Sequence, residues 1–208
     1  MTARRSTPTV VDPFDRFGDH LRIALRAPAS FQLMMWLASG PGAELPPRSS
    51  PPRRGRWVVC GYGRLGRELI EDLHAEGLEC TVVHPAAEPP PVEEVTTVVA
   101  GRGYEPAVLE QAGLADAVGF VAASDNDTTN PSVIAAARRV DPSLFVTARQ
   151  NRPSSGPLFA VMDADSLLVP TEVVAHEVYA QVSTRCCGAS CRRCPRAGTA
   201  GQPTSSTA

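Results

Sequence analysis

From Trp57 onward, short runs of apolar residues alternate with stretches in which apolar positions recur every three or four residues. The short runs predict strands, and the stretches with helical spacing predict amphipathic helices. Because the strands are apolar on both faces and helices separate them, the pattern predicts an α/β fold with a doubly wound parallel sheet. The predicted strands are 57–60, 79–83, 96–99, 117–122, 144–148 and 166–169, and the predicted helices are 64–76, 105–112, 129–140 and 156–162.

One crossover departs from this alternation. The segment "HPAAEPPPVEEV" between the second and third predicted strands holds three consecutive prolines. Proline lacks a backbone N–H and clashes with the preceding helical turn, so a regular crossover helix is excluded there. We expect an extended loop or a single turn.

The apolar and polar pattern divides the chain into five parts. Residues 1–40 form a short N-terminal helical segment with two amphipathic stretches, and residues 41–55 form a linker rich in proline and arginine. The α/β lobe spans 56–170, and a last helix spans 171–184 with Val174, Val178 and Val182 as an apolar stripe suited to dimer packing. Residues 185–208 lose all periodicity and are expected to be a disordered tail.

Composition narrows the function. The net charge is −2, so the chain lacks the basic field typical of nucleic-acid binding. The 20 basic residues are all arginine, and the absence of lysine excludes Schiff-base chemistry, Tyr–Lys hydride-transfer pairs and a Walker-type phosphate loop. The start of the chain does not resemble a secretory signal, and the apolar run 31–38 is too short to span a bilayer. We therefore expect a cytoplasmic protein.

Three glycines follow the first predicted strand as GxGxxG, at Gly61, Gly63 and Gly66. The motif alone is weak, but a strand directly before it and a helix directly after it are the Rossmann-like context that places a helix N-terminus against a pyrophosphate. Gly61 would allow the tight turn, Gly63 the close approach of the ligand, and Gly66 the packing of helix on strand. The alternative is a glycine-rich turn that binds nothing.

A dinucleotide site also needs a carboxylate about twenty residues further on, to hold the ribose hydroxyls. His84 occupies that position, and an imidazole cannot supply a two-oxygen clamp. Glu88 in the proline loop is a possible substitute, and His84 could equally be a loop-edge residue without a role. The ligand preference is therefore expected to be weakened or altered.

Two further groups lie at the predicted carboxyl edge of the sheet. Ser124, Asp125 and Asn126 follow the fourth strand, where they could line a ligand crevice, cap the next helix, or do both. Arg149 ends the fifth strand and could meet a phosphate or be an ordinary surface arginine.

The order of these motifs resembles a known family. The segments "VVCGYGRLGREL", "VVAG", "EPAVLEQAGLADAVGFVAASDNDTTN" and "VTARQN" are similar to the nucleotide-binding lobe of the regulator-of-potassium-conductance family, also called KTN or TrkA N-terminal domains. The resemblance covers about residues 56–183. It implies a cytoplasmic Rossmann lobe that binds NAD(H) or an adenine nucleotide, forms a homodimer through its last helix, and gates a potassium channel or transporter without chemistry on the nucleotide.

The resemblance also implies site residues, with two departures. The phosphate turn would be formed by Gly61, Tyr62, Gly63, Arg64, Leu65 and Gly66, and the adenosine side would be lined by Ser124, Asp125 and Asn126. The family's usual acid after the second strand is His84 here, and its common Gly-Asp after the third strand is Gly101-Arg102. Both changes remove a carboxylate, and they could favour NADP or ATP over NAD or ADP, or leave a site that binds none.

Two other functions fit the same residues. A nicotinamide-dependent oxidoreductase would need a proton donor and a substrate pocket, and the chain offers little beyond the lobe. A Rossmann dimerisation module without a ligand is the other alternative. For the potassium-transport function, we expect contact with a membrane only through the channel or transporter partner, on the inner face of the membrane.

The cysteines divide into two groups. Cys60 and Cys80 lie in apolar runs and are expected to be reduced core residues. The tail cysteines could form a zinc site, although zinc sites usually join two separated pairs. Disulfides or a frameshift after Thr184 are the alternatives, and no metal site is predicted elsewhere. The four tail cysteines are Cys186, Cys187, Cys191 and Cys194.

Overall fold

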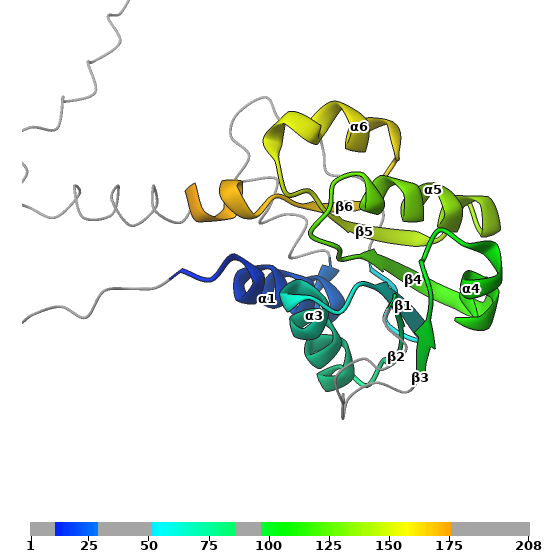
Figure 1. The fold of residues 1–208 in the computed structure, drawn as a ribbon. Helices are drawn as coiled ribbons and strands as arrows, with labels where there is room; N and C mark the ends of the chain where they lie inside the picture. The colour runs from blue at the N-terminus through cyan, green and yellow to red at the C-terminus, as the bar shows by residue number, and fades with distance from the viewer. Residues whose placement is uncertain (1–10, 29–50, 86–96, 176–208) are drawn as a thin grey trace, which may run out of the picture. The chain divides into compact units, whose positions relative to one another are not determined.

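The computed structural model of this chain describes residues 11–28, 51–85 and 97–175, and Figure 1 shows how their elements are arranged. The described residues up to Val174 form one compact unit. Several predictions lie outside the described residues. These are the amphipathic stretch 30–40, most of the linker, the proline crossover with Glu88, the Val178 and Val182 stripe, and the cysteine tail.

Six parallel strands form one sheet, in the order β3-β2-β1-β4-β5-β6. The predicted doubly wound parallel sheet is therefore confirmed. No strand end differs from the predicted one by more than one residue. The strands are β1 Arg56–Cys60, β2 Glu79–His84, β3 Thr97–Ala100, β4 Ala117–Ala122, β5 Phe145–Arg149 and β6 Ser166–Leu168.

Helices cover both faces of the sheet (Figure 1). Alternate residues of β1 serve the two faces: Trp57 and Val59 belong to the apolar cluster that contains α3, and Val58 and Cys60 belong to the cluster that contains α4 and α5. This two-sided burial explains why the strands read as continuous apolar runs. The helices of the lobe are α3 Arg64–Ala75, α4 Pro106–Gln111, α5 Thr129–Val140 and α6 Gly156–Val161, and residues 170–175 begin a further helix.

The N-terminal helix α1, Pro13–Arg26, packs against α3 (Figure 1). Asp12 caps it by accepting a hydrogen bond from the backbone N–H of Phe14 at 3.1 Å, and proline is its first residue. Leu21 and Leu25 join the apolar cluster of α3. A helix here was predicted, but its place beside α3 was not.

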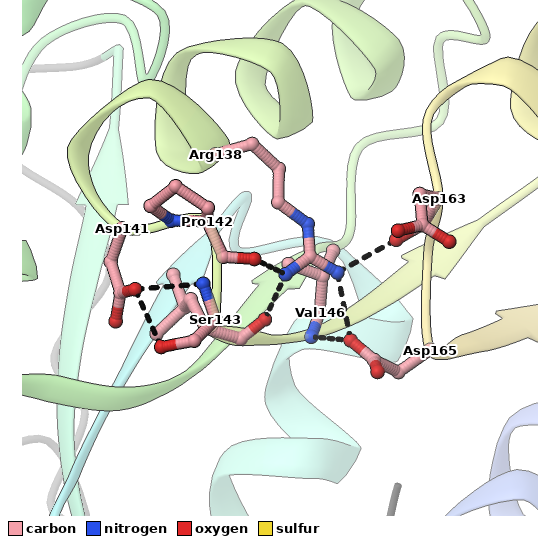
Figure 2. A network of polar contacts seen from close by, with 8 residues as sticks. Arg138, Asp141, Pro142, Ser143, Val146, Asp163 and Asp165 are labelled. Carbon is pink, nitrogen blue, oxygen red and sulfur yellow. Dashed lines mark hydrogen bonds and ion pairs between the residues drawn. The ribbon is translucent and has the colours of Figure 1, made fainter. Parts of the chain in front are cut away.

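A network of polar contacts around Arg138 holds the C-terminal end of α5, as Figure 2 shows. The Arg138 guanidinium donates to the carbonyls of Pro142, Leu144 and Asp163 and to a carboxylate oxygen of Asp165. The same Asp165 oxygen accepts from the backbone N–H of Val146 at 2.8 Å. These contacts fix the last turn of α5 to the segments that lead into β5 and β6.

No helix among the described residues is long and apolar enough to cross a membrane.

Candidate functional site at the carboxyl ends of β1 and β4

The strand order reverses between β1 and β4, because the chain proceeds outward to β2 and β3 on one side and to β5 and β6 on the other. Loops that leave such neighbouring strands diverge, and ligands of open α/β sheets bind between them. The two loops start side by side here, since a Cβ atom at Gly61 would lie 3.1 Å from the backbone nitrogen of Ser124. The sheet thus places the glycine turn and the 124–126 loop at one point.

The three glycines of the turn differ in their surroundings. Gly61 has φ +106°, which L side chains rarely adopt, and its N–H donates to the carbonyl of Val83 at 3.0 Å. A Cβ at Gly66 would overlap the carbonyl oxygen of Gly61. A Cβ at Gly63 would meet no atom of the described residues within 4 Å. Gly61 and Gly66 are therefore required by the fold, whereas the space beside Gly63 is open.

Helix α3 begins at this open space. Gly63 is its N-cap residue, no side chain caps the helix, and its first turn carries no acidic residue. The backbone N–H groups of that turn are the ones that a helix leaves without internal acceptors, and the positive end of the helix dipole lies there. Of the neighbouring residues, Leu65 is fully buried in the core, and Tyr62 is half-buried against it. Arg64 and Arg67, both in the first turn, present exposed positive charges.

The loop after β4 is shaped by its own polar side chains. The Asn126 side-chain oxygen accepts from the backbone N–H groups of Thr128 and Thr129, at 2.8 and 3.3 Å, and the Ser124 hydroxyl accepts from the N–H of Asn126 at 3.2 Å. Asp125 is exposed. Asn126 therefore caps the start of α5, as one of the predicted alternatives held, whereas Ser124 shapes the loop before it. Contact of either residue with a ligand stays a prediction.

Asn130, which the sequence analysis did not single out, joins the ends of β4 and β5. Its side chain is fully buried, donates to the carbonyls of Ser124 and Arg149 at 2.8 and 2.7 Å, and accepts from the N–H of Ser124 at 3.0 Å. The inward position of Asn130 could have been predicted from the sequence. Asn130 precedes the buried Val133 and Ile134 by three and four residues and so lies on the same face of α5.

Asp127 ties the same loop to the segment after β5. Its carboxylate accepts from the backbone N–H groups of Asn151 and Arg152, from the Asn151 side chain and from the Ser155 hydroxyl, at 2.7 to 2.9 Å. Burial alone would raise the pKa of Asp127, but these hydrogen bonds together hold that pKa below its ordinary value. Asp127 was not among the residues predicted from the sequence, because its partners lie more than twenty positions away.

The ends of β2 and β3 carry the two departures from the family pattern. His84 is half-buried, closes β2 and pairs with Ala100 of β3. Arg102 is exposed, and its guanidinium donates to the Tyr104 hydroxyl at 3.0 Å. An imidazole and a guanidinium therefore lie at the strand ends where the family resemblance leads one to expect carboxylates.

Arg149 ends β5 at the carboxyl edge of the sheet, where it is half-buried. Burial lowers the pKa of its guanidinium, and the charges of Asp125 and Asp127 partly offset that effect. Its Cζ atom lies 4.9 Å from the centre of the Phe14 ring, and the Cζ atom of Arg64 lies 5.6 Å from the same centre. The structure thus brings together two predicted site residues that are 85 positions apart in the chain.

The described residues offer no metal site, and a hollow that they form lies away from the candidate site. No group of three or more His, Cys, Asp or Glu side chains could hold a metal ion in the described part of the chain. A hollow of about 360 Å³ lies at the opposite end of the sheet, near the starts of β1 and β2, and it is lined by Gly55, Arg56, Gly77, Glu79 and Asp116. It contains none of the predicted site residues.

The sequence model of the TrkA-N domain matches residues 57–170, which is more than half of the chain. This chain belongs to the TrkA-N domain family. The family resemblance predicted from the order of motifs is thereby confirmed, and the TrkA-N match covers the strands and helices from β1 to β6.

Similar proteins carry this TrkA-N lobe within longer chains. Potassium channel protein 1 of Methanocaldococcus jannaschii is 21% identical over 128 residues, which make up 59% of this chain and 38% of that relative. The present chain therefore spans less than two fifths of the relative's length.

Solved structures share the fold at low identity. GsuK bound to ADP has a TM-score of 0.63 and 19% identity, covering 86% of this chain and 41% of that one. The TrkA-N domain of the inner membrane protein ybaL from Escherichia coli has a TM-score of 0.56 and 20% identity, covering 62% and 96%. The Kef CTD of Shewanella denitrificans in its AMP-bound form has a TM-score of 0.57 and 22% identity, covering 64% and 82%.

Proposed function

We propose that this TrkA-N lobe binds an adenine nucleotide at the carboxyl ends of β1 and β4 and thereby regulates a potassium channel or transporter, without chemistry on the nucleotide. The observation that carries the proposal is the open space beside Gly63, directly in front of the uncapped start of α3. A phosphate group there would meet backbone N–H groups and the positive end of the helix dipole.

The names of similar proteins support both halves of the proposal. A GsuK structure contains ADP, another GsuK channel structure contains NAD, and the Kef structure is in an AMP-bound form. The Methanocaldococcus jannaschii relative is a potassium channel protein. We propose that the present chain acts on the cytoplasmic side of such a membrane protein, as a homodimer that meets the membrane through its partner.

The choice of nucleotide follows from the charges at the strand ends. His84 and Arg102 stand at the two strand ends where a carboxylate would hold ribose hydroxyls, and Arg102 adds a positive charge. We therefore propose that phosphate-rich ligands, ATP or NADP(H), bind at least as tightly as ADP and NAD(H). A lobe that binds none of them would instead be a dimerisation module.

The test is nucleotide binding by the full 208-residue chain, measured by calorimetry and thermal unfolding with each of these nucleotides. A ligand at about 100 times its dissociation constant should add ~2.7 kcal/mol to the free energy of unfolding. If no nucleotide at millimolar concentration binds or shifts the unfolding temperature, the proposal is wrong. Hydride transfer from NADH or NADPH to small carbonyl compounds would favour the oxidoreductase alternative.

Gly63 offers a matched pair of variants for the same test. Gly63 has φ −76° and ψ −168°, which any residue adopts, and both asparagine and aspartate are good N-cap residues. Gly63→Asn and Gly63→Asp should therefore leave the ligand-free protein as stable as the parent. Both side chains fill the open space, and only the carboxylate also repels phosphate. We expect both variants to weaken nucleotide binding, with the aspartate variant weakened further.

The regulatory half needs a transport measurement. In cells that carry the chain beside its transport partner, Gly63→Asp should change potassium flux in the same direction as depletion of the bound nucleotide. A variant that has lost nucleotide binding in vitro but leaves potassium flux unchanged would contradict this half alone.

A further inference from the structure

Helix α1 places an aromatic ring between two arginines of the candidate site. Phe14, in the first turn of α1, lies within cation–π distance of both Arg64 and Arg149, at 5.6 and 4.9 Å from the Cζ atoms to the ring centre. Arg64 opens α3 and Arg149 closes β5, so the ring is close to the carboxyl edge of the sheet on both sides of β4. This edge is where the proposed nucleotide would bind.

Asp12 brings a negative charge to the same place. One of its carboxylate oxygens accepts from the Phe14 N–H and so caps α1, and the other forms an ion pair with the Arg64 guanidinium. The Asp12 side chain is 15% exposed, against 59% for that of Arg64. The arginine that the family resemblance assigns to the phosphate turn is therefore already paired with an anion of the chain itself.

Arg149 is incompletely satisfied in the described structure. Its Nε atom is buried and has no hydrogen-bond partner among the described residues, while its guanidinium lies over the Phe14 ring. A buried donor without an acceptor is costly, and a charge-assisted hydrogen bond to a phosphate would be stronger than the ring contact. An anionic ligand in the crevice would therefore compete with Phe14 for this side chain.

The second half of α1 is held by contacts that do not involve Asp12 or Phe14. Arg22 pairs with Asp72 at 3.2 Å, Arg26 pairs with Glu76 at 2.7 Å, and Leu21 and Leu25 are buried in the cluster of α3. All four lie in the second half of α1 and remain in place if only the Asp12 and Phe14 contacts are released. The first turn can therefore move without undocking the helix.

We propose that Asp12 and Phe14 form an internal plug, which competes with the phosphates of the nucleotide for Arg64 and Arg149. The inference rests on the proposed function. It adds that nucleotide binding releases the first turn of α1, so that the ligand state of the crevice is transmitted to the chain that precedes the lobe.

The first test compares ADP and adenosine binding by the full chain and by Asp12→Asn. Asparagine has the same shape and caps a helix equally well, so the substitution removes only the negative charge that pairs with Arg64. We expect ADP affinity to rise about two- to fivefold, as for release of a partly exposed ion pair, with adenosine affinity unchanged. Asp19→Asn is the matched control, because Asp19 pairs with Arg22 on the same helix. Weaker ADP binding by Asp12→Asn, or the same affinity as Asp19→Asn, would overturn the plug.

The second test separates the plug from the proposed nucleotide site. Amide hydrogen exchange of residues 11–17 is followed in the parent and in Arg64→Ala, with inorganic pyrophosphate as the probe. We expect pyrophosphate to speed exchange at the Phe14 amide in the parent but not in Arg64→Ala. If ADP fails to bind the parent and Asp12→Asn alike, the proposed function is wrong, and the pyrophosphate result still decides the plug. Unchanged or slower exchange in the parent would reject it.

Discussion

At the scale of single residues, the glycine turn combines two kinds of constraint that the sequence pattern cannot separate. Gly61 and Gly66 are glycines for reasons internal to the fold, a left-handed φ at one and contact with a carbonyl oxygen at the other. Gly63 meets no such constraint within the described structure. Substitutions at Gly66 should therefore act on stability, and substitutions at Gly63 on ligand binding.

Gly66→Ala is expected to lower the free energy of unfolding by about 1–3 kcal/mol, because its methyl group would overlap the Gly61 carbonyl oxygen and force α3 away from β1. Alanine favours helix over glycine by up to about 1 kcal/mol, which offsets only part of this cost. Urea unfolding measures the change, with Gly63→Asn as the control. Equal stability of Gly66→Ala and the parent would show that the helix can shift without cost.

Asp127 should make the stability of the lobe depend on pH. Its pKa is lowered in the folded state, so its stabilising contribution is complete above the unfolded value of about 4 and is lost as the pH falls through the folded value. Asp127→Asn should cost about 1–3 kcal/mol at pH 7, because an amide cannot accept all four hydrogen bonds.

The Asp127 measurement is the free energy of unfolding between pH 3 and pH 7, for the parent, Asp127→Asn and Asp125→Asn. The cost of the Asp127 substitution should shrink toward the acid end of this range. Asp125 is exposed, so its substitution should change stability by less than about 0.5 kcal/mol. A cost at Asp127 that stays constant down to pH 3 would contradict the assignment.

The sequence predicted some site residues better than others. The glycine turn, Ser124 and Asn126 could be found because motif and strand end coincide locally. Asn130 could have been found from the helical period. The meeting of Phe14 with Arg64 and Arg149 could not, because it depends on how α1 docks on α3, which no local pattern encodes.

At the scale of elements, apolar runs predicted each strand of the described sheet. The four inner strands are buried on both faces, whereas the edge strands β3 and β6 are partly exposed. The ends shift where partners decide them: β2 extends to His84 because that residue pairs with Ala100, and β1 begins at Arg56 because it pairs with Glu79. Helix α4, Pro106–Gln111, is shorter than predicted. Local propensity thus located the elements, and tertiary pairing set their limits.

Arg138→Ala is expected to cost about 2–3 kcal/mol, since it removes a largely buried guanidinium that joins α5 to the segments before β5 and β6 (Figure 2). Arg139, the next residue, is exposed and provides the control, with an expected change below about 0.5 kcal/mol. Thermal unfolding of the two variants compares them directly. Similar small effects would mean that backbone contacts alone hold this end of α5.

At the scale of the whole molecule, two apolar clusters lie on opposite faces of one sheet, and each buries a thiol. Burial raises the pKa of both Cys60 and Cys80 to about 12. The predicted reduced core cysteines are confirmed as free and buried. These thiols report on the cooperative opening of the lobe.

Cys60 and Cys80 should resist iodoacetamide at pH 8, where roughly one thiol in 10,000 would be ionised. Their labelling rate should rise with urea in parallel with global unfolding, because access requires opening of the sheet or its helices. Mass spectrometry of the separated peptides distinguishes them from the tail cysteines. Rapid labelling in native buffer would contradict the closed core.

The doubly wound pattern predicted the architecture and the edge of the sheet at which a ligand would bind, since these follow from parallel crossovers alone. The transport partner and the homodimer remain predictions. Surface side chains such as Val161, which is 76% exposed, carry no chemistry that identifies what they meet. Regularities of the fold therefore predict where a ligand would bind, but not which partner the lobe regulates.

Under the proposed plug, the ion pair between Asp12 and Arg64 has a mechanical consequence. By thermodynamic linkage, the ligand raises the equilibrium constant for release of the first turn of α1 by some factor. Release of that turn then raises the ligand affinity by the same factor. Tension on the chain ahead of Asp12 would therefore raise the affinity of the crevice for anions. A bound ligand would in turn lower the force needed to release the first turn of α1. The start of α1 would thus couple tension on the chain to ligand affinity.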